Sequence, residues 1–364
     1  MAGQVTIQLV ESDPKAAIEL ASAMRRRGWD VVSASDATMA MSVAVQAKPQ
    51  LVVLNVGIPG GGGLAVLKRM RASVHTAITP VIAMGRHVDP GGNAFLSAGA
   101  QEYVGAQPGA DAVCAAVEKY VGRPLPAPPE APSEMLRAAT RMAALRASGL
   151  LDTDPEKAYD QVTQLAAKLL GVPVSLLSLV DKDRQFFKSQ VGLPEPWATE
   201  RQTPLSHSFC QWVVSGQEVV RIDDARGLPL LRANPAIRDL GVIAYAGVPV
   251  YGKDGQALGS FCAIDTQPRT WTDFDVAILR DLASLVEVCA AQFELGQQPP
   301  VRMSDFDRHV DAAGNAIGGA VGLLHRSGES LDTSEAGTLF AVIRQNSQHL
   351  VQLNRLIQVA DLLD

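Results

Sequence analysis

The chain has 364 residues, 47% of them hydrophobic, and a formal net charge of −6. Domains usually have about 100–150 residues, so we expect two or three. Acidic and basic residues are mixed along the chain, which excludes the clustered basic patch of a nucleic-acid-binding protein. The four cysteines are too few and too scattered for a disulfide framework or a metal finger. The longest apolar runs are too short to span a membrane, and the N-terminus lacks the pattern of a signal peptide. These features predict a reduced, cytoplasmic protein without a metal site, a nucleic-acid partner or membrane insertion.

Proline-rich segments divide the chain. Residues 123–133 read RPLPAPPEAPS, a composition that excludes helix and central strand and stiffens a spacer. GQQPP at residues 296–300 interrupts two helical stretches. The predicted organisation is a first domain over 1–122, a linker over 123–133, a second domain over 134–296 and a third region over 301–364.

The first region alternates strand and helix patterns. Apolar strands are expected at the five segments 4–10, 30–33, 51–55, 80–84 and 102–104. Asp13 and Pro14 form a helix start. Short apolar strands separated by helices predict an α/β, doubly wound five-stranded parallel sheet, whose sites form at the carboxyl ends of its strands.

The phrases LVESDP, LVVLNVGIPGGGGLAVLKRMRA, TPVIAMG and GAQEYV occur in order in this region. Together they resemble the receiver domain of two-component response regulators over about the first 120 residues. In that family, the position of Asn55 carries the aspartate that accepts the phosphoryl group. The degenerate pocket that the resemblance implies contains Glu11, Ser12, Asp13, Asn55 and Gly85.

Several of these residues depart from the family. Asn55 stands in place of the phosphoacceptor aspartate, and Ser12 in place of the second acidic residue. Gly85 stands where the fourth strand carries a hydroxyl residue, and the expected lysine aligns with Ala106 or Gln107. Acyl-phosphate chemistry needs a carboxylate nucleophile and acidic oxygens for Mg²⁺. The sequence therefore predicts a pseudo-receiver that docks or dimerises. A simpler interpretation of Glu11 and Asp13 is a solvated pair that caps the first helix.

The second region has the order helix, two strands, helices, three strands, helix. Asp254-Gly255 marks a hairpin turn, and Thr272 with Asp275 can cap the last helix. The ordered phrases SLLSLVDKDRQFFKSQVGL, LSHSFCQWVVSGQEVVRIDDAR and AYAGVPVYGKDGQALGSFCAIDTQPRTWTDFD resemble the GAF domain. That family implies an α+β fold with an antiparallel sheet, and a small-molecule sensor or dimerisation module.

The candidate GAF ligand pocket is formed by residues from several elements, namely Phe186, His207, Phe209, Cys210, Trp212, Asp223, Tyr245 and Cys262. The alternative is that the aromatic and cysteine side chains simply belong to the core. Gln211 follows Cys210 where bilin-binding members usually carry histidine, and a lone His207 is a weak haem ligand. No cofactor is assigned, and an unknown small ligand or a thiol-based redox role of Cys210 remains open.

The third region has two stretches with heptad spacing, which predict a helical hairpin. Two hairpins would pair into a dimeric four-helix bundle. The expected dimer seam comprises Ile317, Leu324, Ile343, Asn346, Leu350, Leu353 and Ile357. The region resembles the dimerisation hairpin of sensor histidine kinases, but Ala312 stands at the histidine position and His309 one turn earlier. Because the chain ends at Asp364, no ATP-binding domain and no autophosphorylation are expected within it.

The sequence thus predicts a non-catalytic regulator or scaffold of a two-component-type pathway. It would act as a homodimer that docks on a histidine kinase, a response regulator or another signalling protein. One alternative is a small-molecule or redox sensor based on the GAF domain. Another is a phosphorelay intermediate that a partner kinase phosphorylates at a non-standard residue such as His309.

Overall fold

The computed structural model describes residues 5–85, 92–105, 108–126 and 131–294. The chain divides into two compact units between Pro132 and Ser133, at the end of the proline-rich segment. The boundary expected near 296–300 and the helical hairpin expected over 301–364 lie outside the described residues. All the expected seam residues lie there too, namely Ile317, Leu324, Ile343, Asn346, Leu350, Leu353 and Ile357.

The first unit is built on a five-stranded, fully parallel sheet with the order β2-β1-β3-β4-β5. This confirms the doubly wound α/β fold that the strand and helix pattern predicts. The strands are β1 (Thr6–Val10), β2 (Asp30–Ala34), β3 (Leu51–Asn55), β4 (Val81–Met84) and β5 (Glu102–Val104). The helices are α1 (Pro14–Arg26), α2 (Ala37–Ala47), α3 (Gly62–Ala72), α4 (Gly92–Ser97) and α5 (Ala110–Tyr120).

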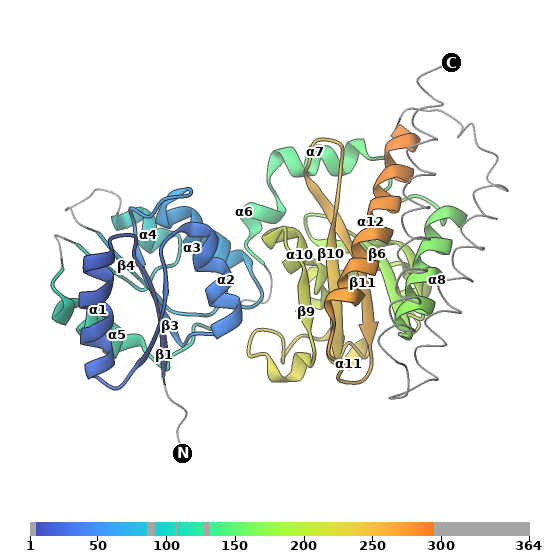
Figure 1. Cartoon of the computed structure of the whole chain (residues 1–364). Coiled ribbons are helices and arrows are strands. Elements are labelled where there is room, and N and C mark those ends of the chain that lie inside the picture. The colour runs from blue at the N-terminus through green and yellow to red at the C-terminus, as the bar shows by residue number, and fades with distance from the viewer. Residues whose placement is uncertain (1–4, 86–91, 106–107, 127–130, 295–364) are drawn as a thin grey trace, which may run out of the picture. The chain divides into compact units, whose positions relative to one another are not determined.

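Helices cover both faces of this sheet. α1 and α5 bury their apolar residues on one face, and α2 and α3 on the other (Figure 1). α1 begins where expected, because Asp13 Oδ1 accepts hydrogen bonds from the backbone N–H groups of Lys15 and Ala16 at 2.9 and 3.3 Å. Every residue of β3 is buried, so its carboxyl end emerges from the middle of the domain.

Arg71, in the last turn of α3, organises two loops of this unit. Its guanidinium donates hydrogen bonds to the carbonyl oxygens of Thr76, Ala77 and Thr79 at 3.4, 3.2 and 2.9 Å. It also donates to the carbonyl oxygen of Gly99 at 2.8 Å, in the turn between α4 and β5. Burial lowers the pKa of Arg71 to about 10, so the group is still protonated at neutral pH. The Arg71 guanidinium therefore links the loop before β4 to the loop before β5.

The second unit is an antiparallel six-stranded sheet with the order β8-β7-β6-β11-β10-β9. The strands are β6 (Val174–Val180), β7 (Arg184–Val191), β8 (Gln202–Pro204), β9 (Val220–Ile222), β10 (Ala244–Tyr251) and β11 (Ala257–Asp265). The helices of this unit are α6 (Ser133–Leu136), α7 (Ala139–Ala147), α8 (Lys157–Leu170), α9 (Trp197–Glu200), α10 (Cys210–Gly216), α11 (Ala236–Asp239) and α12 (Asp273–Glu294), with 3-10 turns η1 (Leu205–His207) and η2 (Ala225–Gly227). The sequence predicts five of the strands and misses β8, because three residues ending in proline carry no alternation signal.

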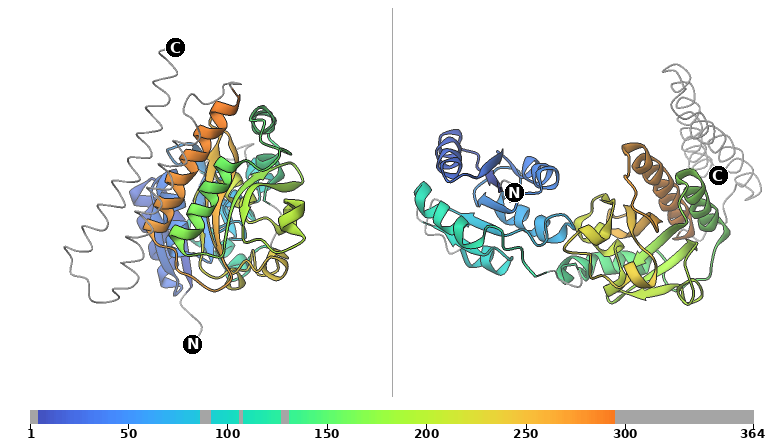
Figure 2. Two further views of the ribbon diagram at one scale, coloured as in Figure 1. Left: turned by 90° about the vertical axis from the view of Figure 1, so that its right-hand side faces the viewer. Right: turned by 90° about the horizontal axis from the view of Figure 1, so that it is seen from below.

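The helices α8 and α12 lie side by side on one face of this sheet (Figures 1 and 2). The expected cap of α12 is present, since Thr272 Oγ1 accepts from the Asp275 N–H at 3.1 Å and Asp275 Oδ2 accepts from the Thr272 N–H at 2.8 Å. The expected hairpin turn between β10 and β11 is also present, with Gly255 at φ +74°. α10 packs on the other face, against β11 and β10.

β6 and β11 approach each other closely at Gly259, which pairs with Leu179 in the centre of the sheet. A Cβ at this glycine would overlap with the carbonyl oxygen of Ser178 and approach Leu179 Cα to 2.9 Å. Because the neighbouring atoms are backbone, no side-chain rotation could make room. Glycine at this position therefore sets the spacing of the two central strands. Within the part of the chain that the structure describes, no helix is long and apolar enough to cross a membrane.

Candidate functional site

The carboxyl edge of the parallel sheet brings Glu11 and Asn55 together. Glu11 directly follows β1 and Asn55 ends β3, and the two side chains are only 6% and 8% exposed. Asn55 Nδ2 donates a hydrogen bond to Glu11 Oε2 at 2.7 Å, and Asn55 Oδ1 accepts one from the Gly57 N–H at 2.8 Å. Both ends of the amide are thus engaged, which fixes its orientation.

A cavity of about 310 Å³ opens at this edge. Of the expected pocket residues, Glu11, Asp13, Asn55 and Gly85 line it, whereas Ser12 is exposed and is not part of its lining. The other lining residues are Ala16, Leu20, Met84 and Pro108. Asp13 caps α1 and its N–H donates to Glu11 Oε1 at 2.9 Å. Asp13 therefore has the expected capping role as well as a pocket position, whereas Glu11 is buried and does not cap the helix.

Tyr103 of β5 occupies the space beside Gly85. A Cβ at Gly85 would overlap with the Tyr103 hydroxyl and approach Val56 Cγ2 to 3.4 Å. A hydroxyl-bearing side chain at position 85 would therefore displace the tyrosine. The tyrosine hydroxyl thus lies where the side chain of a fourth-strand hydroxyl residue would begin.

The donor set of this pocket does not suit Mg²⁺. The ion binds several carboxylate or water oxygens in octahedral geometry. Here both carboxylate oxygens of Glu11 already accept hydrogen bonds from the chain, and the oxygen of the Asn55 amide is turned toward Gly57. Among the residues that the structure describes, no cluster of three or more His, Cys, Asp or Glu could hold a metal ion.

The Asn55–Glu11 contact predicts an unusual dependence on Mg²⁺ in a variant. Asn55→Asp replaces the donating amide by a second carboxylate beside Glu11, so it should cost about 2 kcal/mol of stability at neutral pH. Millimolar Mg²⁺ should recover most of that loss, because a cation between two carboxylates removes the repulsion. Asn55→Ala loses the same hydrogen bond without adding charge, so its stability should not depend on Mg²⁺. Thermal unfolding of both variants with and without Mg²⁺ checks this, and equal responses would contradict it.

In the second unit, five of the expected pocket residues lie on the α10 side of the sheet. Phe209 directly precedes α10, Cys210 and Trp212 belong to it, and Tyr245 and Cys262 come from β10 and β11; all five are buried. The Phe209 and Tyr245 rings are 5.5 Å apart. The sulfur atoms of Cys210 and Cys262 are 3.9 Å apart, and the Tyr245 hydroxyl donates to Cys210 Sγ at 3.4 Å.

The other three expected pocket residues lie elsewhere. Phe186 packs with α8 and α12 on the opposite face of the sheet. Asp223 is exposed, and its Oδ1 accepts from the Trp271 N–H at 3.3 Å, so it orders the loop before α12. His207 lies in η1, where its Nε2 is 3.2 Å from Asp239 Oδ2. The structure therefore does not gather all eight residues in one place.

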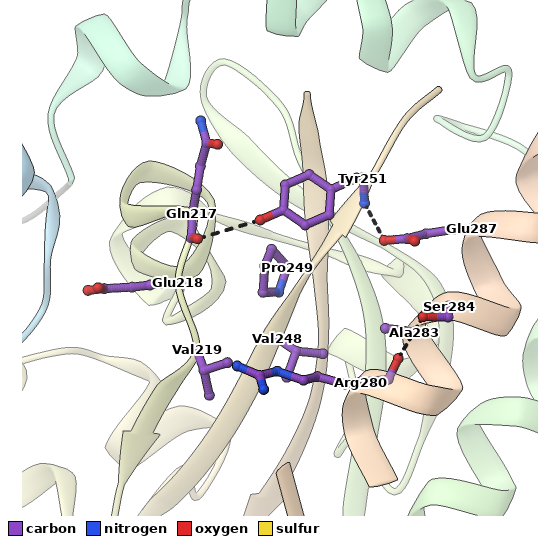
Figure 3. A pocket seen from close by; sticks show the side chains of 10 residues that line it. All are labelled: Gln217, Glu218, Val219, Val248, Pro249, Tyr251, Arg280, Ala283, Ser284 and Glu287. Atoms are coloured by element: carbon purple, nitrogen blue, oxygen red, sulfur yellow. Dashed lines mark hydrogen bonds between the residues drawn. The ribbon is translucent and has the colours of Figure 1, made fainter. Parts of the chain in front are cut away.

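The sequence analysis missed a polar network and a cavity. Beside Cys210, the buried Gln185 accepts from Ser208 Oγ at 2.7 Å and donates to Thr203 Oγ1 at 2.7 Å. On the α12 side, a cavity of about 520 Å³ lies between β10 and α12 (Figure 3). It is lined by Gln217, Glu218, Val219, Val248, Pro249, Tyr251, Arg280, Ala283, Ser284 and Glu287. The polar residues of α12 in this lining follow helical spacing, which in a sequence looks like an ordinary solvated face.

Glu287 is the most constrained polar group of the α12 cavity. Its Oε1 accepts from the Tyr251 N–H at 2.8 Å, and burial raises its pKa. The Tyr251 hydroxyl in turn donates to the carbonyl oxygen of Gln217 at 3.5 Å (Figure 3). These bonds join α12, β10 and the segment before β9, so they serve the fold.

Comparisons with known proteins follow the same division of the chain. The model of the response regulator receiver domain matches residues 7–118, and that of the GAF domain matches residues 154–289. The cyclic di-GMP phosphodiesterase PA2567 of Pseudomonas aeruginosa is 34% identical over 149 residues, which cover 40% of this chain and 24% of that protein. The probable transcriptional regulatory protein TcrX of Mycobacterium tuberculosis is 31% identical over 100 residues, covering 28% of this chain and 42% of that protein. The chain thus spans less than half the length of either relative.

Among solved structures, the BeF₃-activated receiver domain of Klebsiella pneumoniae RstA is 21% identical. The match covers 32% of this chain and 99% of that one, with a TM-score of 0.30. The two family models match the regions that form the parallel sheet and the antiparallel sheet. Residues 7–118 are therefore a response regulator receiver domain and residues 154–289 a GAF domain, a combination that fits a signal-transduction regulator.

Proposed function

We propose that this chain is a non-catalytic, dimeric regulator or scaffold of a two-component pathway. Its receiver domain acts by docking on a histidine kinase, a response regulator or another signalling protein, and takes no phosphate itself. The observation that carries the proposal is the Asn55 amide, which occupies the phosphoacceptor position and bonds to Glu11 at 2.7 Å.

The chemistry of the receiver pocket supports this proposal. An acyl phosphate forms by attack of a carboxylate oxygen, and a neutral amide is a much weaker nucleophile. The Asn55 amide oxygen is also turned to the Gly57 N–H, so it does not point freely into the cavity. The parallel sheet and its covering helices are nevertheless complete, so the domain can still present a folded surface to a partner. A receiver fold that cannot be phosphorylated is left with that surface.

PA2567 is named as a cyclic di-GMP phosphodiesterase, but we do not propose that activity for this chain. The matched segment covers 24% of that protein, so the activity of the whole relative does not transfer to this chain. The sensor alternative rests on a different observation, the buried thiols of the GAF domain, and is independent of the receiver pocket.

Native mass spectrometry of the full chain after incubation with acetyl phosphate and Mg²⁺ tests the proposal. We expect a dimer without added phosphoryl mass. Phosphate that is released by mild base would show an aspartyl phosphate and overturn the receiver assignment. Phosphate that survives base and is lost in acid would favour the relay alternative at a histidine such as His309, which lies outside the described residues. A monomer would overturn the dimeric part of the proposal.

A further inference from the structure

Two thiols meet inside the GAF domain although they are 52 residues apart in the chain. Cys210 is the first residue of α10, and Cys262 lies on β11, on the face of the sheet that α10 covers. Their sulfur atoms are 3.9 Å apart, and the two residues are 3% and 0% exposed. A disulfide bond is about 2.05 Å long, so the sulfurs would have to approach by roughly 1.9 Å.

Tyr245 completes the surroundings of the pair. Its hydroxyl donates to Cys210 Sγ at 3.4 Å and lies 3.1 Å from Ser260 Oγ. The ring reaches this position by lying along its own strand over Gly247, where a Cβ would overlap with the hydroxyl and approach Ser260 Oγ to 2.8 Å. Glycine at 247 and serine at 260 therefore place a hydrogen-bond donor beside Cys210.

The two thiols differ in acidity. Hydrogen bonds from the Cys262 thiol and the Tyr245 hydroxyl lower the pKa of Cys210 in spite of burial. Burial raises the pKa of Cys262 well above its ordinary value, and it does the same for Tyr245. Because the Tyr245 hydroxyl donates to Cys210 Sγ, a negative charge on sulfur is better stabilised at Cys210, which makes Cys210 the attacking thiolate and Cys262 the thiol that resolves the product.

The remaining cysteines lack these properties. Burial raises the pKa of the Cys289 thiol to about 11, so it is protonated at neutral pH. Cys114 lies in the receiver domain, and burial raises its pKa as well. They are therefore matched controls that the same chain contains.

We propose that Cys210 and Cys262 form a two-electron redox site, which a small hydroperoxide oxidises to an intramolecular disulfide. The Cys210 thiolate attacks one peroxide oxygen; the O–O bond breaks, water leaves after protonation, and Cys210 becomes a sulfenic acid. The Cys262 thiol then attacks this sulfur, the S–O bond breaks, and a second water leaves. In sum, two thiols and one hydrogen peroxide give one disulfide and two waters. A dithiol reductant reverses the change.

Burial determines which oxidants can react. With both sulfurs almost fully buried, only a small uncharged molecule such as hydrogen peroxide can reach Cys210, whereas bulky alkylating reagents cannot. The disulfide would tie α10 to β11 covalently and withdraw the sulfur that Tyr245 contacts. Oxidation would therefore change the packing of α10 on the sheet. This site is independent of the receiver pocket and stands whether or not that pocket takes phosphate.

The test uses the full chain treated with hydrogen peroxide, then unfolded in an alkylating reagent and analysed by mass spectrometry. Four alkylated thiols are expected before oxidation and two after it, from the four cysteines of the chain. Peptide mapping should find Cys210 linked to Cys262, and dithiothreitol should restore four. A link that involves Cys114 or Cys289, a link between two chains, or four alkylated thiols after oxidation would overturn the proposal.

Variants separate the two roles. Cys262→Ser should leave a sulfenic acid on Cys210 that dimedone traps when the oxidised chain is unfolded in the reagent. Cys210→Ser should slow peroxide consumption by about tenfold or more, because no thiolate remains at the site. Cys289→Ser is the matched control and should form the disulfide at the unchanged rate. Dimedone labelling of Cys289 in place of Cys210 would contradict the assignment. The mapping of the unmodified chain decides the question even if a variant does not fold.

Discussion

Arg71→Met is expected to destabilise the receiver domain by about 3 kcal/mol, because it leaves several buried carbonyl oxygens without their donor. Methionine keeps much of the volume of the stem but offers no N–H group. The oxygens of Thr79 and Gly99, now bonded at 2.9 and 2.8 Å, would lose the shortest of these contacts. Hydrogen exchange with mass spectrometry should therefore show faster exchange around β4 and β5.

Arg69→Met is the matched control for Arg71. Both arginines lie in the last turn of α3, but Arg69 is exposed. Its loss should change stability by less than about 0.5 kcal/mol, as is usual for surface positions. Equal effects at the two positions would show that helix propensity, and not the bonds of Arg71 to the loops, carries the stability.

Gly259→Ala is expected to destabilise the GAF domain by about 3 kcal/mol or more, since the added methyl group meets backbone atoms of β6. The Ser178 carbonyl and Leu179 Cα cannot move without separating the two central strands. The expected result is a lower midpoint in denaturant and loss of exchange protection along β6 and β11. Unfolding should be followed domain by domain, because two domains need not unfold in one step.

Gly255→Ala provides the comparison for Gly259. Gly255 has φ +74° and no atom within 4 Å of its added Cβ, so alanine there costs backbone strain alone. We expect about 1 kcal/mol, the usual cost of a left-handed non-glycine residue. If Gly259→Ala were no worse than Gly255→Ala, the close approach of β6 and β11 would not limit the packing of the sheet.

Local signals predicted most of both sheets. β3 and β5 have the predicted bounds, and β3 was clearest because it is a short apolar run between polar and glycine-rich segments. The caps at Asp13 and Thr272 were also predictable, because capping depends on neighbouring residues only. The short elements between β7 and β10 were less predictable. Segments of three or four residues are stabilised by tertiary packing and carry little signal in the local sequence.

The candidate sites were predictable to different degrees. The meeting of Glu11 and Asn55 follows from the topology, since parallel strands end at the same edge of a sheet. In the GAF domain, Phe186 faces α8 and α12, whereas its neighbour Gln185 bonds to Ser208 on the other face. Alternate residues of a strand face opposite sides of the sheet, so a shift of one residue changes the face on which each side chain lies. The pairing of β7 with β6 has a register irregularity opposite Leu177 and Ser178, which the sequence does not reveal.

The packing around Gly85 and Asn55 bears on how this chain can evolve. Aspartate at position 55 alone would set a second carboxylate against Glu11, and a side chain at position 85 alone would overlap with Tyr103. Aspartate at position 55 is therefore destabilising wherever Mg²⁺ is absent, and a side chain at position 85 requires the Tyr103 ring to move. Natural proteins are only slightly more stable than function requires, so such intermediates are readily purged. Selection for folding would then tolerate a carboxylate at position 55 only where Mg²⁺ is available to the pocket, so the metal would be a condition for stability as well as for chemistry.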